Sequence, residues 1–231
     1  MRVPAGGGRI GGQSLHYVPS HKADGLEQEE RGRSATERDE FLRAAWRVLV
    51  AGVVDPTKLV FVDECGTHTS LAPLYGYSPK GERLRLSVPR NRGKNTTLLA
   101  SITLEGMGPS LALDGSTTKE VFEAYLEHVL LPELEEGQVL VMDSLPAHKP
   151  NRVRGMIEER GLELLYLPSY SPDYNPIEEA FAKIKEILRR ACARTREALL
   201  EALGEALSAV SFQDAQGFFE HAGYHTTDQL L

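Results

Sequence analysis

The chain has 231 residues, of which 41% are hydrophobic, and this length and composition predict one full-sized hydrophobic core. Its formal net charge of -7 excludes nucleic-acid binding through overall positive charge, so DNA binding would need local basic patches. Two distant cysteines, Cys65 and Cys192, argue against a disulfide framework or a structural zinc site and suit a reducing compartment.

The chain carries no signal for a membrane or for export. No run approaches the roughly 18 apolar residues of a membrane span, and Met1 is not followed by an apolar signal core. We therefore expect a soluble protein of the cytoplasm.

The first 33 residues predict a poorly structured, glycine-rich arm ahead of one domain over residues 34–231. Gly6, Gly8 and Gly11 match the G-x-G-x-x-G dinucleotide fingerprint, but that motif needs a strand before it and a helix after it. Because no strand signal precedes these glycines, we assign no dinucleotide site.

Hydrophobic periodicity predicts the elements of the domain. Thr36 to Val50 predicts a helix with a core-facing stripe of Phe41, Leu42, Ala45, Trp46, Leu49 and Val50. The other predicted elements are a strand over 58–62, β-rich segments around 75–77, 83–88, 96–104 and 110–113, a helix capped by Thr117 or Thr118, a strand over 138–142, a helix over 151–160, a strand over 162–167, and helices that begin near residues 176, 196 and 212. This order predicts an α/β fold with a mixed sheet flanked by helices, in which three antiparallel strands precede two further strands. It is also the order of the ribonuclease H-like fold.

The stretch from Tyr166 to Glu179 predicts a strand end, a rigid turn and a helix start. Asn175 is a typical N-cap, and Pro176 suits the first helical position. Glu178 then falls in the first turn of the helix. It is either a functional carboxylate or a capping-box residue that bonds back to the Asn175 amide.

Three carboxylates follow from this layout as candidate site residues. Asp63 and Asp143 each end an apolar strand, and Glu178 enters on the helix after the last strand. Catalytic groups of open α/β sheets gather outside the carboxyl ends of strands. Three clustered carboxylates repel one another unless cations bind them, and a pair of Mg²⁺ or Mn²⁺ ions suits hard oxygen ligands. The alternative is that each Asp is an ordinary turn or capping residue.

The chain resembles the bacterial insertion-sequence branch of the mariner-type DDE transposases. The resemblance covers residues 40 to 225 and rests on Val60–Gly66, on Val141–Asp143 with His148 and Lys149, and on Tyr170–Glu178. Thirty-four residues separate Asp143 from Glu178, as in that superfamily, and this spacing selects Glu178 over Glu179. Ser144 and Ser169 depart from the usual Asn and Pro.

The resemblance implies a transposase catalytic domain. Asp63, Asp143 and Glu178 would bind two Mg²⁺ or Mn²⁺ ions, cleave DNA at the ends of an insertion sequence and join the 3′ ends to target DNA. Glu64 and Glu179 would be accessory or structural. The partners implied are transposon-end and target DNA, a second copy in a homodimer, and a helix-turn-helix recognition half that residues 1–33 do not encode. The alternatives are a ribonuclease H-like nuclease and an inactive, truncated DNA-binding remnant.

Basic residues supply candidate DNA contacts in a protein of negative net charge. The first group is Lys80, Arg83, Arg85, Arg90, Arg92 and Lys94, and His148 and Lys149 are added from the resemblance. A second group is Lys183, Lys185, Arg189, Arg190, Arg194 and Arg196. Each group could instead be a solvated surface, and His148 could instead make a structural hydrogen bond.

Two weaker motifs are rejected. Gly93-Lys94-Asn95 lacks the first glycine and the hydroxyl residue of a P-loop, so we expect no ATP site. His221 and His225 are separated by Gly223, which ends the helix between them, so we expect no zinc site.

Overall fold

The computed structural model describes residues 38–83, 85, 87–89, 94–143 and 151–225. The predicted arm over residues 1–33 lies outside these ranges. None of the helices within them is long and apolar enough to cross a membrane.

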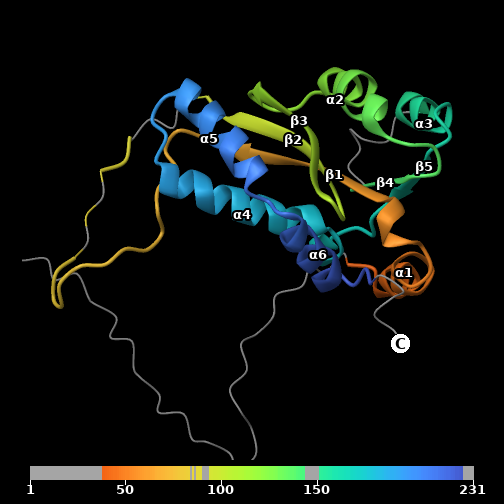
Figure 1. The fold of residues 1–231 in the computed structure, drawn as a ribbon, viewed down its shortest axis with the longest axis horizontal. Helices are drawn as coiled ribbons and strands as arrows, with labels where there is room; N and C mark the ends of the chain where they lie inside the picture. Colours follow the sequence, from red (N-terminus) through yellow and green to blue (C-terminus); the bar gives the residue numbers. More distant parts are fainter. Residues whose placement is uncertain (1–37, 84, 86, 90–93, 144–150, 226–231) are drawn as a thin grey trace, which may run out of the picture. The chain divides into compact units, whose positions relative to one another are not determined.

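A five-stranded mixed sheet forms the centre of the domain, with the strand order β3-β2-β1-β4-β5 (Figure 1). The strands are β1 (Leu59–Thr67), β2 (Thr96–Thr103), β3 (Gly106–Asp114), β4 (Val139–Met142) and β5 (Glu163–Tyr166). The first three strands are antiparallel to one another, whereas β4 runs parallel to β1 and β5 runs parallel to β4. The predicted ribonuclease H-like arrangement of three antiparallel strands followed by two further strands is confirmed.

Helices cover both faces of this sheet (Figure 1). They are α1 (Glu40–Trp46), α2 (Lys119–Tyr125), α3 (Asn151–Glu158), α4 (Pro176–Ala191), α5 (Arg196–Ser208) and α6 (Phe212–His221). α1 and α2 each continue into a short π-helical turn. The Thr118 hydroxyl caps α2 by accepting from the Val121 amide, as predicted.

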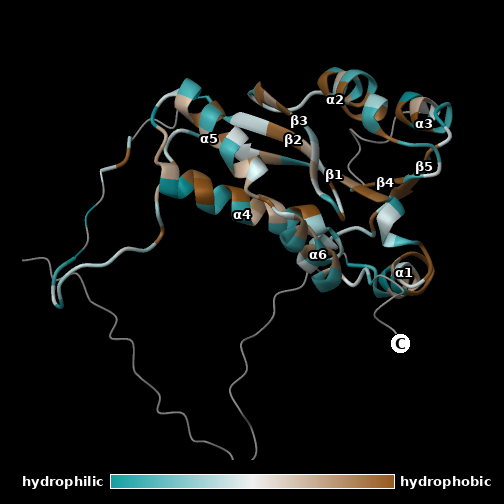
Figure 2. Cartoon of the chain, viewed as in Figure 1, coloured by the Kyte–Doolittle hydropathy of each residue, from teal (hydrophilic) through white to brown (hydrophobic). Residues whose placement is uncertain are grey.

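The core has two layers, one on each side of the sheet. In β1, Phe61 and Cys65 face the layer that contains α4, α5 and α6, whereas Val60 and Val62 face α2 and α3. A strand buried on both faces needs an unbroken apolar run, and Leu59 to Val62 supply it. Figure 2 shows β4 and the adjoining part of β1 in brown, while the helices alternate between brown and teal as amphipathic helices do.

One predicted strand boundary is wrong, and two predicted β-rich segments form no strand among the described residues. β1 does not end at Val62, because residues 63–67 continue the strand by pairing with β2. Asp63 therefore lies inside β1 and beside the end of β4. The segment around Tyr75 and Tyr77 forms no strand, and both tyrosines are almost fully exposed. Among the described residues of 83–88 there is no strand either.

α1 also differs from its prediction. The helix begins at Glu40, where the Asp39 carboxylate accepts from the Phe41 and Leu42 amides, both at 3.0 Å. Trp46 is buried as expected, but Phe41 is 80% exposed. The apolar side chains left exposed on α1 and the following turns are Phe41, Leu42, Val48, Leu49 and Val53.

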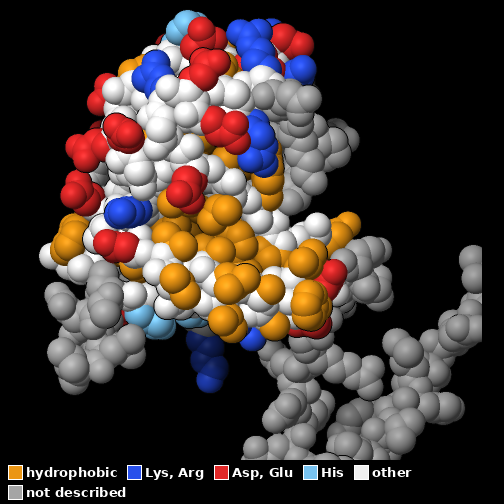
Figure 3. Space-filling view, turned by 90° about the vertical axis from the view of Figure 1, so that its right-hand side faces the viewer, with side chains coloured by type: hydrophobic (Ala, Val, Ile, Leu, Met, Phe, Trp, Pro, Cys, Tyr) orange, Lys and Arg blue, Asp and Glu red, His pale blue; other side chains and the backbone are white. Residues whose placement is uncertain are grey.

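The exposure of these side chains has a physical cause. The buried side of α1 carries Arg43, which pairs with an aspartate of the turn before α4, and this contact sets the rotation of the helix about its axis. Figure 3 shows hydrophobic side chains gathered on one face, at the height of α1 in Figure 1.

Candidate active site

Strand register places Asp63 and Asp143 next to each other. In the parallel pair of β1 and β4, Phe61 lies opposite Val141, so the residues two positions further on are also neighbours. Phe61 and Val141 both face the α4 layer, and side chains alternate with a period of two residues. Both aspartates therefore lie on the α4 face of the sheet. Neighbouring strands are about 4.8 Å apart, which brings the two backbones close.

α4 brings the third carboxylate to the same place. Its inner face is buried against the sheet through residues such as Ile177, Phe181 and Ile184, which recur at helical spacing. Glu178 occupies the first turn of this helix and is exposed. Acidic residues are common in the first turn of a helix, where the positive end of the helix dipole lies.

One cavity of about 390 Å³ contains all three carboxylates. Its lining consists of Asp63, Asp143, Asn175, Glu178 and the turn residues 167–172. Within the described ranges, no three His, Cys, Asp or Glu side chains lie close enough together to hold one metal ion. Gathering the three acids around an ion thus requires side-chain rotation, which the exposed Glu178 can supply.

Both oxygens of the Asp63 carboxylate accept hydrogen bonds. The Glu64 amide donates to Oδ1 at 2.7 Å, and Asn175 Nδ2 donates to Oδ2 at 2.8 Å. The Asn175 amide itself donates to the Pro172 carbonyl at 3.0 Å. The capping-box interpretation of Glu178 is therefore wrong, because the amide it would bond is used within the turn.

The neighbouring Glu179 has a different role. It forms an ion pair with His221 of α6, and this hydrogen bond together with the charge of Glu179 raises the pKa of His221. Glu179 does not line the cavity of the three carboxylates. The two adjacent glutamates are thus separated by the structure, one at the cavity and one at a helix–helix contact.

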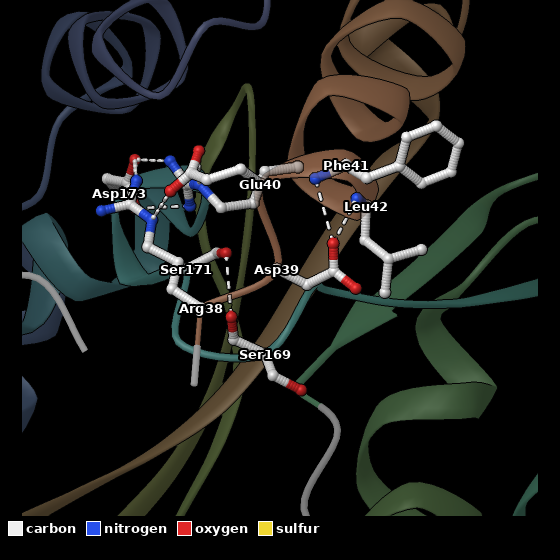
Figure 4. Close-up of polar contacts among 9 residues, drawn as sticks. Arg38, Asp39, Glu40, Phe41, Leu42, Ser169, Ser171 and Asp173 are labelled. Atoms are coloured by element: carbon white, nitrogen blue, oxygen red, sulfur yellow. Dashed lines mark hydrogen bonds and ion pairs between the residues drawn. The ribbon is translucent and has the colours of Figure 1, made fainter. Parts of the chain in front are cut away.

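The turn before α4 is anchored to α1 by a bidentate ion pair. Arg43 Nη1 donates to Asp173 Oδ1 at 3.0 Å, and Nη2 donates to Oδ2 at 2.6 Å. Arg43 is only 1% exposed and its guanidinium lies 4.1 Å from the centre of the Tyr174 ring. Figure 4 shows Arg38 reaching the same carboxylate. This planar, bidentate pairing is specific to arginine.

A buried hydrogen-bond chain from Trp46 of α1 through Tyr224, which follows α6, also holds this turn. Trp46 Nε1 donates to the Tyr224 hydroxyl at 2.9 Å, and that hydroxyl donates to the Tyr174 carbonyl at 2.8 Å. Ser171 also donates to the Ser169 carbonyl within the turn (Figure 4). The turn is therefore fixed from two sides.

The sequence predicted no role for Tyr170, which begins the Tyr170–Glu178 run. This residue lines the cavity with a φ of +56°, a left-handed conformation that non-glycine residues rarely adopt. Such strain is often found at functional sites. No local signal in the sequence singles it out, since serine and proline on either side predict only a turn.

Among the described candidate DNA-binding residues, none lines the cavity. Lys80, Arg83, Arg85 and Lys94 are exposed. Arg90, Arg92, His148 and Lys149 lie outside the described residues.

The second basic group is largely engaged in contacts within the chain. Lys183 pairs with Asp214 and Arg190 with Glu186. Arg196 pairs with Asp114, and Arg194 donates to the carbonyls of Thr69 and Leu71. These contacts favour the first group for DNA.

We predict that Asp173→Asn lowers the free energy of unfolding at pH 7 by about 1.5–3 kcal/mol, the range for hydrogen bonds to charged groups. Burial alone would raise the pKa of Asp173, but the hydrogen bond and charge of Arg43 outweigh it and lower the pKa. A depressed pKa stabilises the fold above the pKa of the unfolded chain, and this stabilisation is lost in acid.

Urea denaturation between pH 7 and pH 3 measures this effect. The difference between the unmutated protein and Asp173→Asn should shrink as the pH falls below about 4. A difference that stays constant with pH would contradict the role of the ion pair. Glu186→Gln, which removes an exposed pair on α4, is the control and should change stability by less than about 1 kcal/mol.

Comparisons with known proteins agree with this geometry. A family model described as DDE superfamily endonuclease matches residues 58–200, more than half of the chain. The Tc1 transposase of Caenorhabditis elegans is 28% identical over 138 residues, which cover 58% of this chain and 50% of that protein. The Tcb1 transposase of Caenorhabditis briggsae is 32% identical over 108 residues, covering 44% and 40%. The chain spans about half the length of these relatives. Both are nematode proteins, so the comparisons do not support the bacterial branch.

Solved structures share the fold. A Mos1 transposase paired-end complex with the left transposon end superposes with a TM-score of 0.69 at 19% identity, covering 87% of this chain and 64% of that one. The catalytic domain of Mos1 mariner transposase superposes with a TM-score of 0.57 at 18% identity, covering 80% and 84%. The fold, the site and the family match lead to one conclusion: the chain belongs to the DDE superfamily endonucleases, among relatives of the Tc1/mariner transposases.

Proposed function

We propose that this chain is the catalytic domain of a transposase that cleaves DNA at transposon ends and joins the 3′ ends to target DNA. Asp63, Asp143 and Glu178 are the proposed catalytic and metal-binding residues. The observation that carries the proposal is that three carboxylates from β1, β4 and α4 line one cavity, with the family's 34-residue spacing between the last two. The Tc1 and Mos1 relatives, which are transposases by name, support it.

The residues present fit divalent metal ions. The three acids offer only hard oxygen ligands, which suit Mg²⁺ or Mn²⁺ rather than zinc. Mos1 structures with Mg and with Mn support this choice. When bound, a pair of such ions would activate a water or a 3′-hydroxyl and would stabilise the leaving oxygen.

The fold of the chain positions the three carboxylates for this chemistry. β1 and β4 hold Asp63 and Asp143 on rigid, buried strands, and α4 carries Glu178 at its N-terminal turn. The anchored turn from 168 to 175 forms one wall of the cavity and keeps the start of α4 against the sheet. A phosphodiester that entered the cavity would meet carboxylates from three separate elements.

We predict that Glu178→Gln abolishes Mn²⁺-dependent nicking of supercoiled plasmid, whereas Glu179→Gln retains it. Both variants remove one charge from adjacent positions of the same helix, but only Glu178 lines the cavity. Catalytic carboxylates of this kind contribute several powers of ten to the rate, so the loss should exceed 100-fold.

Gel electrophoresis of the plasmid, with an EDTA control, gives the result. Equal activity in both variants, or loss only in Glu179→Gln, would refute the assignment. Joined products from pre-cut transposon ends would support a transposase, whereas cutting without joining would favour the ribonuclease H-like nuclease.

We propose that Lys80, Arg83, Arg85, Arg90, Arg92, Lys94, His148 and Lys149 contact DNA. The exposure of Lys80, Arg83, Arg85 and Lys94 supports this proposal. Each phosphate contact releases counterions, so it contributes to the salt dependence of binding.

Arg83→Ala combined with Arg85→Ala should weaken binding to duplex DNA and reduce the slope of log K against log salt by about 0.9 for each lost phosphate contact. Fluorescence anisotropy at several salt concentrations measures the slope. Arg190→Ala, whose guanidinium pairs with Glu186, is the matched control and should leave the slope unchanged. An unchanged slope in the double variant would exclude both arginines from DNA contact.

We also propose that the chain acts as a homodimer together with a helix-turn-helix recognition half. The fold shared with a Mos1 transposase paired-end complex with the left transposon end supports this proposal. The exposed hydrophobic side chains of α1 support a protein contact on that face. Sedimentation velocity with and without transposon-end DNA tests the dimer. Membership of the bacterial insertion-sequence branch, and the cytoplasm as location, stay proposals that rest on the sequence alone.

A further inference from the structure

We propose that Asn175 is a positioning residue for the Asp63 carboxylate rather than a cap for α4. This inference rests on the proposed function, because it concerns how one member of the proposed metal-binding triad is oriented. Asn175 opens the run Asn175-Pro176-Ile177-Glu178 at the start of a helix, where an asparagine would be expected to act as a cap.

The first observation is that Asn175 occupies the N-cap position without capping. Its backbone is extended, with φ −112° and ψ 96°, and Pro176 follows at the first helical position. An Asn in this place normally accepts from the amide two or three residues ahead through Oδ1. No such side-chain bond forms at Asn175, whereas Asp39, Thr118, Thr195 and Ser211 all cap their helices through side chains.

The second observation is where the side chain goes instead. Asn175 Nδ2 donates to Asp63 Oδ2 at 2.8 Å, across 112 residues of sequence. An ionised carboxylate only accepts hydrogen bonds, so the NH₂ group of the amide must face it. The need for a donor therefore fixes which way the Asn175 amide is turned, with Nδ2 toward Asp63 and Oδ1 away from it.

The third observation is the state of the other amide atom. Asn175 is 5% exposed, and in the described part of the chain its buried Oδ1 has no hydrogen-bond partner. A buried, unpaired carbonyl is unfavourable, and turning the side chain back to the α4 amides would pair it. The bond to Asp63 is thus made at the expense of the helix start.

The bond to Asp63 has a specific consequence for a metal ligand. Together with the Glu64 amide, Asn175 fixes both oxygens of the carboxylate and so defines its plane. Both donors are neutral, so they orient the carboxylate without cancelling the charge that attracts a cation. A lysine or arginine at position 175 would compete with the ion.

Replacing Asn175 with Ser and with Ala separates positioning from capping. Ser is a good N-cap but too short to reach Asp63, whereas Ala can do neither. If Asn175 orients Asp63, both variants should weaken Mn²⁺ binding by about tenfold or more, the usual effect of removing a group that orients a metal ligand. The melting temperature of metal-free Asn175→Ser should match or exceed that of Asn175→Ala.

Isothermal titration with Mn²⁺ measures the dissociation constant, and circular dichroism of the metal-free protein measures the melting temperature. Thr118→Ala is the matched control, because it removes a true cap from α2 and should lower the melting temperature without changing Mn²⁺ affinity. Recovery of full Mn²⁺ affinity in Asn175→Ser, with loss only in Asn175→Ala, would overturn the proposal and make Asn175 a cap.

The same titration distinguishes failure of this inference from failure of the proposed function. If the unmutated protein binds Mn²⁺ and both Asn175 variants bind it equally well, the inference alone is overturned. If the unmutated protein binds no Mn²⁺, both the proposed metal site and this inference are overturned.

Discussion

The parallel pairing of β1 with β4 is the constraint on which the rest of this site depends. Because side chains alternate along a strand, the register that sets Phe61 opposite Val141 also sets Asp63 beside Asp143 on the α4 face. A slip of one residue would turn one aspartate to the α2 and α3 side. The apolar residues on both faces of β1 and β4 prevent that slip, since each layer of the core requires its own set of side chains.

The turn before α4 carries the third carboxylate, and it is fixed by distant parts of the chain. Arg43 of α1 holds Asp173, Tyr224 beyond α6 holds the Tyr174 carbonyl, and Asn175 reaches Asp63 on β1. Each contact is made by a buried or partly buried group, where hydrogen bonds and charges act in a low dielectric. The strained Tyr170 belongs to the same turn and lines the cavity. Rigid support of this kind suits a site that must hold carboxylates against their mutual repulsion.

Much of this arrangement could be predicted from the sequence because it depends on local pattern. The apolar runs of β1 and β4 predicted two buried strands, and Asn175 followed by Pro176 predicted the start of α4. The features that could not be predicted depend on long-range pairing. β1 continues past Asp63 because β2 pairs with it, and the apolar stripe of α1 is half exposed because Arg43 meets a carboxylate 130 residues away. Asn175 was predicted to cap because a local signature cannot show a partner 112 residues earlier.

In the proposed function, three carboxylates from three elements form one metal-binding unit, and the stoichiometry of Mn²⁺ binding tests this most directly. Electron paramagnetic resonance of free Mn²⁺ during titration counts the ions bound per chain. We expect the unmutated protein to bind two ions, and Asp143→Asn to lose at least one ion and to bind the other more weakly. Two ions bound with unchanged affinity by Asp143→Asn would show that the metals lie elsewhere, and the cavity between β1, β4 and α4 would not be the site.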